Sequence, residues 1–173
     1  MRNITGALAG IQFSNAILRE LAESGISSNI RRSSNNPEKI QSIEWDNHFL
    51  LFDKTPKFIK KNIDVILLKS KMEHTSMKEL LSVQKNYVAL GELKGGIDPA
   101  GADEHWKTAN SALERIRQSF KTQSPALFFV GAAIEADMAQ EIFAQLKDGR
   151  LTSAANLTSH KQLADLATWL VHL

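Results

Sequence analysis

The sequence contains no cysteine among its 173 residues. This absence excludes disulfide bonds, cysteine metal sites and a thiol nucleophile. The chain also has no apolar run of about 18 residues, the length that a helix needs to cross a bilayer. Its first segment, Met1 to Gly10, does not have the long apolar stretch of a signal peptide. We therefore expect a soluble, cytoplasmic protein without a membrane partner.

The chain has no large excess of charge of either sign. It carries 21 Lys and Arg against 19 Asp and Glu, a net charge of +2. A balance this mild neither requires nor excludes nucleic acid as a partner, so the positions of the charges matter more than their sum. Hydrophobic residues make up 43% of the chain, enough for a substantial core, and the length predicts one domain over residues 1–173.

Hydrophobic periodicity and turn residues predict alternating helices and strands. Helices are predicted over residues 5–24, 76–85, 102–121 and 134–147, and after Ser159. Strands are predicted over residues 48–52, 63–68, 87–94, 125–132 and 151–157. A polar loop is predicted over residues 27–37 and a turn over residues 53–56. The pattern indicates an α/β (α+β) fold with a mixed central sheet flanked by helices.

Two of the apolar strands carry ionisable residues, which buried strands rarely do unless these residues are paired or bind a metal. Asp64 lies in the strand over residues 63–68, and Glu92 and Lys94 lie in the strand over residues 87–94. Because side chains alternate along a strand, Glu92 and Lys94 should share one face, with Leu93 directed into the core on the other.

This arrangement suits the cleavage of a phosphodiester bond. Asp64, Glu92 and the backbone carbonyl of Leu93 offer hard oxygen ligands for Mg²⁺, which keeps several of its waters. Such a metal activates water and stabilises negative charge, and Lys94 could orient the attacking water or stabilise the same charge. The alternative is structural, because Glu-Leu-Lys is a common tripeptide and is usually a solvated strand edge.

These residues also resemble a known motif. Asp64 with Glu92-Leu93-Lys94 resembles the Asp…(Asp/Glu)-X-Lys pattern of the PD-(D/E)XK nuclease superfamily. The run GELKGGIDPAGADEHWK, Gly91 to Lys107, resembles the active-site segment of the AvaI/BsoBI family of type II restriction endonucleases. The resemblance implies a restriction-endonuclease-like core and Mg²⁺-dependent hydrolysis of double-stranded DNA at a short, degenerate palindromic site. It implies Asp64 and Glu92 as metal ligands and Lys94 as the catalytic lysine.

The same resemblance implies roles for three further residues. His105 would be catalytic, positioning or deprotonating the attacking water near the scissile phosphate. Asp98 would contact bases, since an aspartate can accept a hydrogen bond from cytosine N4, and Lys61 would contact DNA. Each has a structural alternative: His105 in the first turns of a helix, Asp98 with Pro99 in a turn, and Lys61 on a solvated face.

The segment before Asp64 contains a run of basic residues. Lys57 and Lys60, together with Lys54 and Lys61, are candidates for neutralising DNA phosphates. A run of this kind is more often a solvated face than a contact with DNA. Its position beside Asp64 favours a contact with DNA.

The resemblance implies partners as well as chemistry. Family members act as homodimers on twofold sites, and a DNA methyltransferase of the same specificity is the expected functional partner. The resemblance corresponds to about the C-terminal half of a family member, without the N-terminal helical region that helps to recognise DNA. Two alternatives stay open: a truncated or inactive DNA-binding remnant, and a PD-(D/E)XK nuclease of DNA repair. The long match from Gly91 to Lys107 favours a restriction enzyme.

Overall fold

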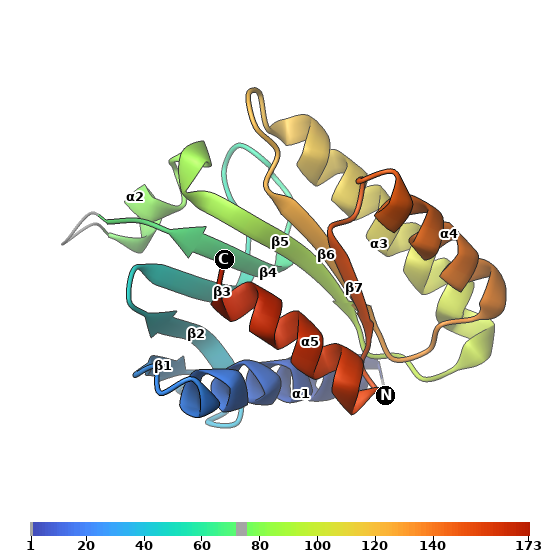
Figure 1. Cartoon of the computed structure of the whole chain (residues 1–173), viewed down its shortest axis with the longest axis horizontal. Helices are drawn as coiled ribbons and strands as arrows, with labels where there is room; N and C mark the ends of the chain where they lie inside the picture. Colours follow the sequence, from blue (N-terminus) through green and yellow to red (C-terminus); the bar gives the residue numbers. More distant parts are fainter. Residues whose placement is uncertain (1, 72–75) are drawn as a thin grey trace.

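The computed structural model describes residues 2–71 and 76–173 (Figure 1). Its helices are α1 (Arg2–Glu23), α2 (Met77–Leu80), the 3₁₀ turn η1 (Gln84–Asn86), α3 (Pro99–Ser119), α4 (Ala136–Lys147) and α5 (His160–Val171). Its strands are β1 (Asn29–Arg32), β2 (Ile40–Trp45), β3 (His48–Lys54), β4 (Ile63–Lys69), β5 (Tyr87–Lys94), β6 (Ala126–Gly131) and β7 (Ser153–Asn156). Among the described residues, no helix is both long enough and apolar enough to cross a bilayer.

The strands of the described chain form one seven-stranded sheet whose spatial order follows the chain from β1 to β7. β1 to β5 pair antiparallel, as a meander, whereas β5, β6 and β7 pair parallel. Parallel neighbours need a crossover, and α3 and α4 supply the two crossovers. The mixed sheet flanked by helices that the sequence predicted is therefore confirmed, with β5 as the strand at which the pairing changes direction.

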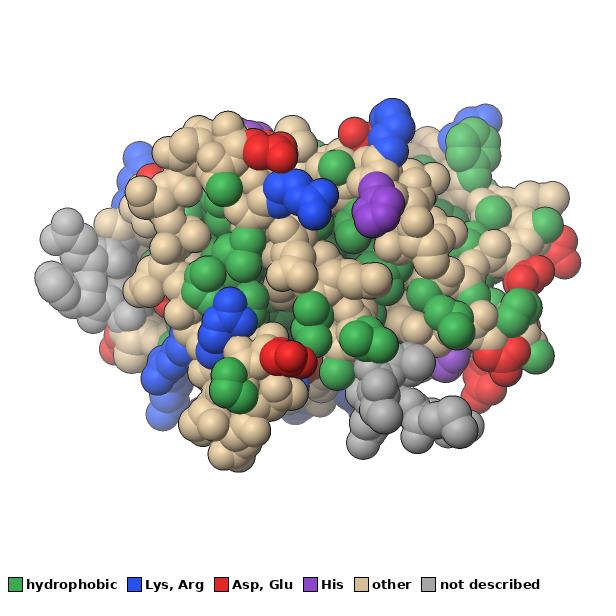
Figure 2. Space-filling view, turned by 90° about the horizontal axis from the view of Figure 1, so that it is seen from below, with side chains coloured by type: hydrophobic (Ala, Val, Ile, Leu, Met, Phe, Trp, Pro, Cys, Tyr) green, Lys and Arg blue, Asp and Glu red, His purple; other side chains and the backbone are tan. Residues whose placement is uncertain are grey.

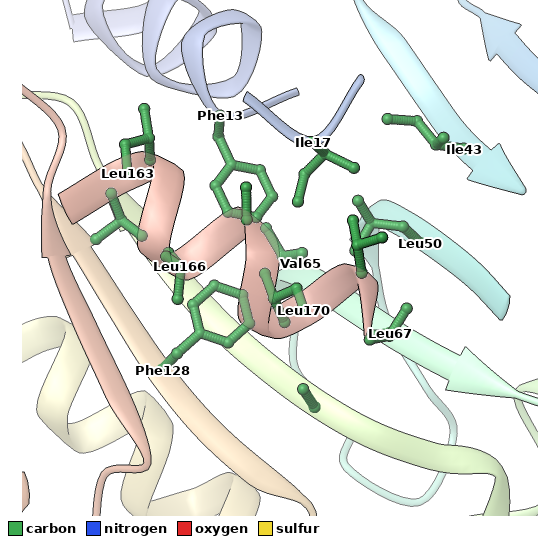
Figure 3. Packing of buried hydrophobic residues seen from close by; sticks show 14 of the residues in the cluster. Phe13, Ile17, Ile43, Leu50, Val65, Leu67, Phe128, Leu163, Leu166 and Leu170 are labelled. Atoms are coloured by element: carbon green, nitrogen blue, oxygen red, sulfur yellow. The ribbon is translucent and has the colours of Figure 1, made fainter. Parts of the chain in front are cut away.

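Helices cover both faces of the sheet. α1 and α5 pack side by side on one face, and α3 and α4 lie on the other (Figure 1). On the first face Phe13 of α1 stacks on Phe128 of β6 with ring centroids 5.9 Å apart, and Leu166 and Leu170 of α5 lie beside them (Figure 3). Burial of each such side chain contributes about 1.5–3 kcal/mol, so the two helices hold the sheet firmly from this side.

The ends of the helices follow local chemistry that the sequence shows. Asp98 caps α3 by accepting a hydrogen bond from the Ala100 N–H at 3.1 Å, and Pro99 occupies the first turn, where its missing N–H costs nothing. Ser159 caps α5 in the same way, as predicted. Gly25, at a φ of 67°, follows α1 and takes the left-handed conformation that ends many helices.

The predicted polar loop over residues 27–37 is wrong in part, because β1 occupies Asn29–Arg32 and pairs with β2. All four residues of β1 are exposed, and its sequence therefore lacks the apolar alternation by which a half-buried strand is predicted. Arginines on an edge strand discourage pairing with other chains. β2 was not predicted, since Gln41, Ser42 and Glu44 interrupt its apolar pattern. Hydrogen bonding to β3 nevertheless makes it a strand.

Two further boundaries differ from the prediction. The helix predicted over residues 76–85 has the expected capping box of Ser76 and Glu79, but it ends at Leu80. The Asn86 side chain donates to the Leu80 carbonyl at 3.1 Å, which satisfies an acceptor that a continuing helix would have used. The turn predicted at residues 53–56 starts later, because β3 continues to Lys54 with Asp53 at a φ of 52°.

Gly91 of β5 lies beneath a buried aromatic ring. A Cβ built at this position would come within 2.2 Å of the Phe128 ring, which is fully buried. We expect Gly91→Ala to lower the free energy of unfolding by about 1–3 kcal/mol, because the ring has no free space into which it can move. Chemical denaturation measures this loss. Gly10→Ala is the control: among the described residues, no atom outside its chain neighbours and the backbone of α1 lies within 4 Å of its Cβ position, so alanine should be neutral or stabilising in α1. Equal stability of the two variants would contradict the prediction.

Candidate active site

The pairing of β4 with β5 brings the predicted acidic residues together. Val65 lies opposite Gly91 in the antiparallel register, so Asp64 and Glu92 are the next residues along their strands at the same end of the sheet. Lys94 follows two residues later on the face of β5 that carries Glu92, whereas Leu93 packs against the apolar cluster on the α1 side. The prediction that Glu92 and Lys94 share one face of the strand and Leu93 lies on the other is therefore confirmed.

Lys94 joins the two carboxylates. Its Nζ lies 2.9 Å from Glu92 Oε2 and 3.2 Å from Asp64 Oδ2. Asp64 Oδ2 also accepts a hydrogen bond from the backbone N–H of Leu93 at 2.8 Å, which ties the β4 side chain to the β5 backbone. These contacts fix both carboxylates. Asp64 of β4 is bound to two groups on β5, and Glu92 is bound to Lys94 on its own strand. We call Asp64, Glu92 and Lys94 the acid–lysine cluster.

One buried oxygen of the cluster has no partner among the described residues. Glu92 is only 4% exposed, and its Oε1 is buried without a hydrogen bond to any described residue. Burial, followed by the negative charge of Asp64, raises the pKa of Glu92 to about 7 even though Lys94 opposes both effects. Burial alone would lower the pKa of Lys94, but attraction to Glu92 and Asp64 outweighs it and raises that pKa. Lys94 therefore stays protonated, but it is one cation facing two carboxylates, so the cluster has a net negative charge when both carboxylates are ionised.

The donor set of this cluster fits a hard divalent cation. Two carboxylates and an unpartnered buried oxygen provide negative charge and a free acceptor, which are the properties that Mg²⁺ or Ca²⁺ requires. The described residues contain no group of three His, Cys, Asp or Glu that could hold a metal. Any cation here would complete its coordination with water or backbone oxygens, as Mg²⁺ commonly does.

His105 lies on α3, and Asp98 is the residue that caps the N-terminus of this helix. The His105 side chain is exposed, and its imidazole lies against Gly96, since a Cβ on Gly96 would come 2.7 Å from Nε2. Gly96 is two residues beyond Lys94, so the ring is beside the loop that leaves the acid–lysine cluster. Asp98 serves as the helix cap, and its other predicted role, contact with bases, stays a prediction.

The predicted DNA-contacting lysines lie between β3 and β4. Lys57, Lys60 and Lys61 are all exposed, and none forms a salt bridge with another described residue. Lys61 precedes Asp64 by three residues. On the face shown in Figure 2, basic and acidic side chains are interspersed, and the described side chains there do not gather into one basic patch. These lysines remain candidates for contact with DNA because of their position.

A cavity adjoins Asp64, and the sequence did not predict it. It has a volume of about 390 Å³ and lies between α1, residues 36–40, the end of β3, and Asp64 and Leu93. The small residues Gly6 and Gly10 of α1 leave this space, and an ion pair of Lys39 with Asp53 at 2.7 Å lies in its wall. No sequence signal marks these residues, since they come from segments that only the fold brings together.

The fold and the cluster define a class of protein. A mixed sheet flanked by helices, with two carboxylates and a lysine on neighbouring strands, is a restriction-endonuclease-like fold. The sequence matches the family described as "Restriction endonuclease BsobI" over residues 1–173, and the chain belongs to this family.

Curated relatives agree with this assignment. The chain is 42% identical over 191 residues to "Type II restriction enzyme AvaI" of Nostoc sp. and of Anabaena variabilis. It is 40% identical over 194 residues to "Type II restriction enzyme BsoBI" of Geobacillus stearothermophilus. Each match covers 100% of this chain and 60% of the relative. The chain therefore spans about three fifths of the length of these relatives.

The raised pKa of Glu92 makes stability depend on pH. In the absence of divalent cations, the folded chain keeps a proton on Glu92 up to about pH 7, whereas the unfolded chain releases it near 4.5. The stability that this proton contributes is complete below pH 4.5 and is lost as the pH rises to about 7. We expect Glu92→Gln to flatten this part of the profile and to raise the free energy of unfolding at pH 8 by about 1–3 kcal/mol.

Urea denaturation at a series of pH values, with EDTA present, measures this effect. The free energies of unfolding of the wild-type chain and the variant should converge near pH 4.5. At that pH Glu92 is protonated in the folded state, so replacing it with an uncharged amide changes little. A variant that is less stable than wild type at pH 8 would contradict the prediction, because it would show that nearby groups already compensate the charge of Glu92.

Proposed function

We propose that this chain is the catalytic part of a type II restriction endonuclease, which hydrolyses phosphodiester bonds in double-stranded DNA. The observation that carries the proposal is the acid–lysine cluster, in which Glu92 has a buried, unpartnered oxygen. A buried carboxylate beside a second, partly exposed one, with a single lysine between them, is unfavourable for folding alone, so a further cationic ligand accounts for it. The names of the relatives, AvaI and BsoBI type II restriction enzymes, support DNA as the substrate.

Asp64, Glu92 and the backbone carbonyl of Leu93 would hold a divalent cation, and we propose Mg²⁺. Small hard cations prefer carboxylate and carbonyl oxygens and keep part of their water. When bound, the cation supplies positive charge beside the scissile phosphate and favours deprotonation of the attacking water. Its charge also favours the ionised form of Glu92, whose pKa in the free chain is about 7. We therefore expect metal binding to release a proton near neutral pH.

Lys94 and His105 would divide the remaining chemistry. The pKa of Lys94 is raised, so this group acts as a cation and not as a base. Its ammonium can donate hydrogen bonds to the phosphate or to the attacking water and stabilise the negative charge that builds up. Histidine is the side chain best suited to accept a proton at neutral pH. His105, exposed beside the loop after Lys94, is the proposed acceptor of the proton from water.

The exposed lysines and Asp98 would meet the DNA. Lys57, Lys60 and Lys61 are proposed to neutralise backbone phosphates near the cleavage site. Asp98 is proposed to read a base edge, with one carboxylate oxygen still accepting from Ala100. A palindromic site matches a twofold protein, so we propose a homodimer. A methyltransferase of the same specificity would protect the host DNA.

Cleavage of DNA tests the proposal directly. The purified chain with Mg²⁺ should convert a plasmid into discrete fragments, and Lys94→Ala should cut it about 10²–10³-fold more slowly, the usual cost of removing a group that stabilises transition-state charge. Lys161→Ala is the control: its side chain is 85% exposed on α5 and pairs only locally with Asp165. This variant should cut at the wild-type rate.

Other outcomes of the same experiment separate the alternatives. Equal cleavage by the wild-type chain and Lys94→Ala would reject the catalytic role of the cluster. Smears in place of discrete fragments would support a nuclease without site specificity. A shift of DNA in a gel, with no cutting at any Mg²⁺ concentration, would support a DNA-binding role without catalysis.

Metal binding has a readout that is independent of activity. We expect Mg²⁺ to raise the melting temperature of the wild-type chain, because a ligand of the folded state stabilises it. Asp64→Asn should lose most of this shift, since it removes a charged oxygen ligand. Asp165→Asn on α5 should keep it, because that carboxylate is exposed and pairs with Lys161. Equal shifts in all three proteins would place the cation elsewhere.

A further inference from the structure

We infer that Gly96 is a positioning residue for His105: by having no side chain, it leaves the space in which the imidazole lies against the loop that leaves the acid–lysine cluster. The contact itself is a feature of the fold. Its importance for catalysis rests on the proposed function of His105.

A side chain at position 96 would overlap the imidazole of His105. A Cβ at this position would come 2.7 Å from His105 Nε2 and 3.1 Å from Cδ2. The first distance is shorter than real Cβ atoms tolerate, so the ring edge occupies the place where another residue would carry its side chain. Gly101, one turn before His105 on α3, is less crowded, with its Cβ position 3.4 Å from Nε2. That is an ordinary van der Waals contact.

Gly96 is not needed for its backbone conformation. Among the described glycines, those with a positive φ are Gly25 and Gly149. An alanine at position 96 would therefore meet no backbone strain. Its clash would be with the far end of one side chain and not with backbone. The expected response to Gly96→Ala is thus a displaced imidazole within an intact fold.

Both sides of the contact are held in place. On the loop side, the Lys94 carbonyl accepts a hydrogen bond from the Ala132 N–H at 2.9 Å, which fixes the end of β5 against the segment after β6. On the helix side, Trp106 is 1% exposed, and its Nε1 donates to Glu141 of α4 at 2.6 Å. The backbone on both sides of the contact is therefore anchored, and the space at Gly96 allows the ring to lie against the loop.

NMR spectroscopy of the free chain tests the contact without DNA or metal. The ring signals of His105 are assigned by their loss in His105→Ala. We expect nuclear Overhauser effects between these ring protons and the α protons of Gly96. Gly96→Ala should shift the His105 ring signals and leave the other assigned histidine signals in place. Gly101→Ala is the matched control and should leave the His105 signals close to their wild-type positions.

Cleavage rates test the consequence. General acid–base groups contribute about 10²–10⁴-fold to rates, and a displacement of about 1 Å can cost about 10²-fold. We expect Gly96→Ala to slow cleavage about 10–100-fold, with unchanged affinity for DNA in Ca²⁺, and Gly101→Ala to cut normally. The double variant Gly96→Ala/His105→Ala should be no slower than His105→Ala, because both changes act through one group.

The outcomes distinguish this inference from the proposed function. Absence of the Overhauser effects in the wild-type chain, or equal changes in Gly96→Ala and Gly101→Ala, would overturn the inference. A slow His105→Ala variant with a normal Gly96→Ala variant would also overturn it and leave the proposed function intact. Normal cleavage by His105→Ala would reject the proposed role of His105, and a wild-type chain that does not cut would reject the nuclease; in both cases the NMR spectra still decide the contact.

Discussion

The ammonium group of Lys94 lies between the carboxylates of Glu92 and Asp64, at 2.9 and 3.2 Å. Glu92 is almost fully buried, and the other two side chains are partly exposed. Removing charges from water is unfavourable, and one cation offsets two anions only in part. The interaction therefore holds β4 and β5 in register and also leaves a deficit of positive charge. The loss of stability at higher pH in the free state and the proposed affinity for a cation are two consequences of the same arrangement, because a ligand that fills the deficit also relieves the repulsion.

The rest of the fold supplies the surroundings that this cluster requires. β5 is the central element, since it carries Glu92 and Lys94 and pairs antiparallel with β4 but parallel with β6. The parallel partner comes after a crossover, so α3 has to start directly beyond the cluster. Gly91 permits the Phe128 ring to close over β5, and Gly96 leaves room for His105. Two glycines flanking the Glu-Leu-Lys segment thus serve different neighbours, one in the core and one at the surface.

The sequence predicted those features that depend on local chemistry. Asp64 and Glu92 were recognisable because charged residues in apolar strands are unusual. Ser159 was recognisable as a helix cap because capping follows a local pattern. Features that depend on distant partners were not predictable. β1 has four exposed residues and is a strand only because β2 lies beside it. The unpartnered oxygen of Glu92 likewise results from the packing of both faces of the sheet, which no short segment encodes.

The sheet has another property, which concerns the order of events during folding. Its strands are arranged in the order of the chain, so each strand pairs with the strand that precedes it. Contacts between segments close in sequence form fast, and a chain made from its N-terminus can add strands one at a time. β5 can pair with β4 while its other edge is still open to water. The carboxylates would then come together while they are still hydrated. Most of the desolvation of Glu92 would occur later, when β6 and the crossover helices dock.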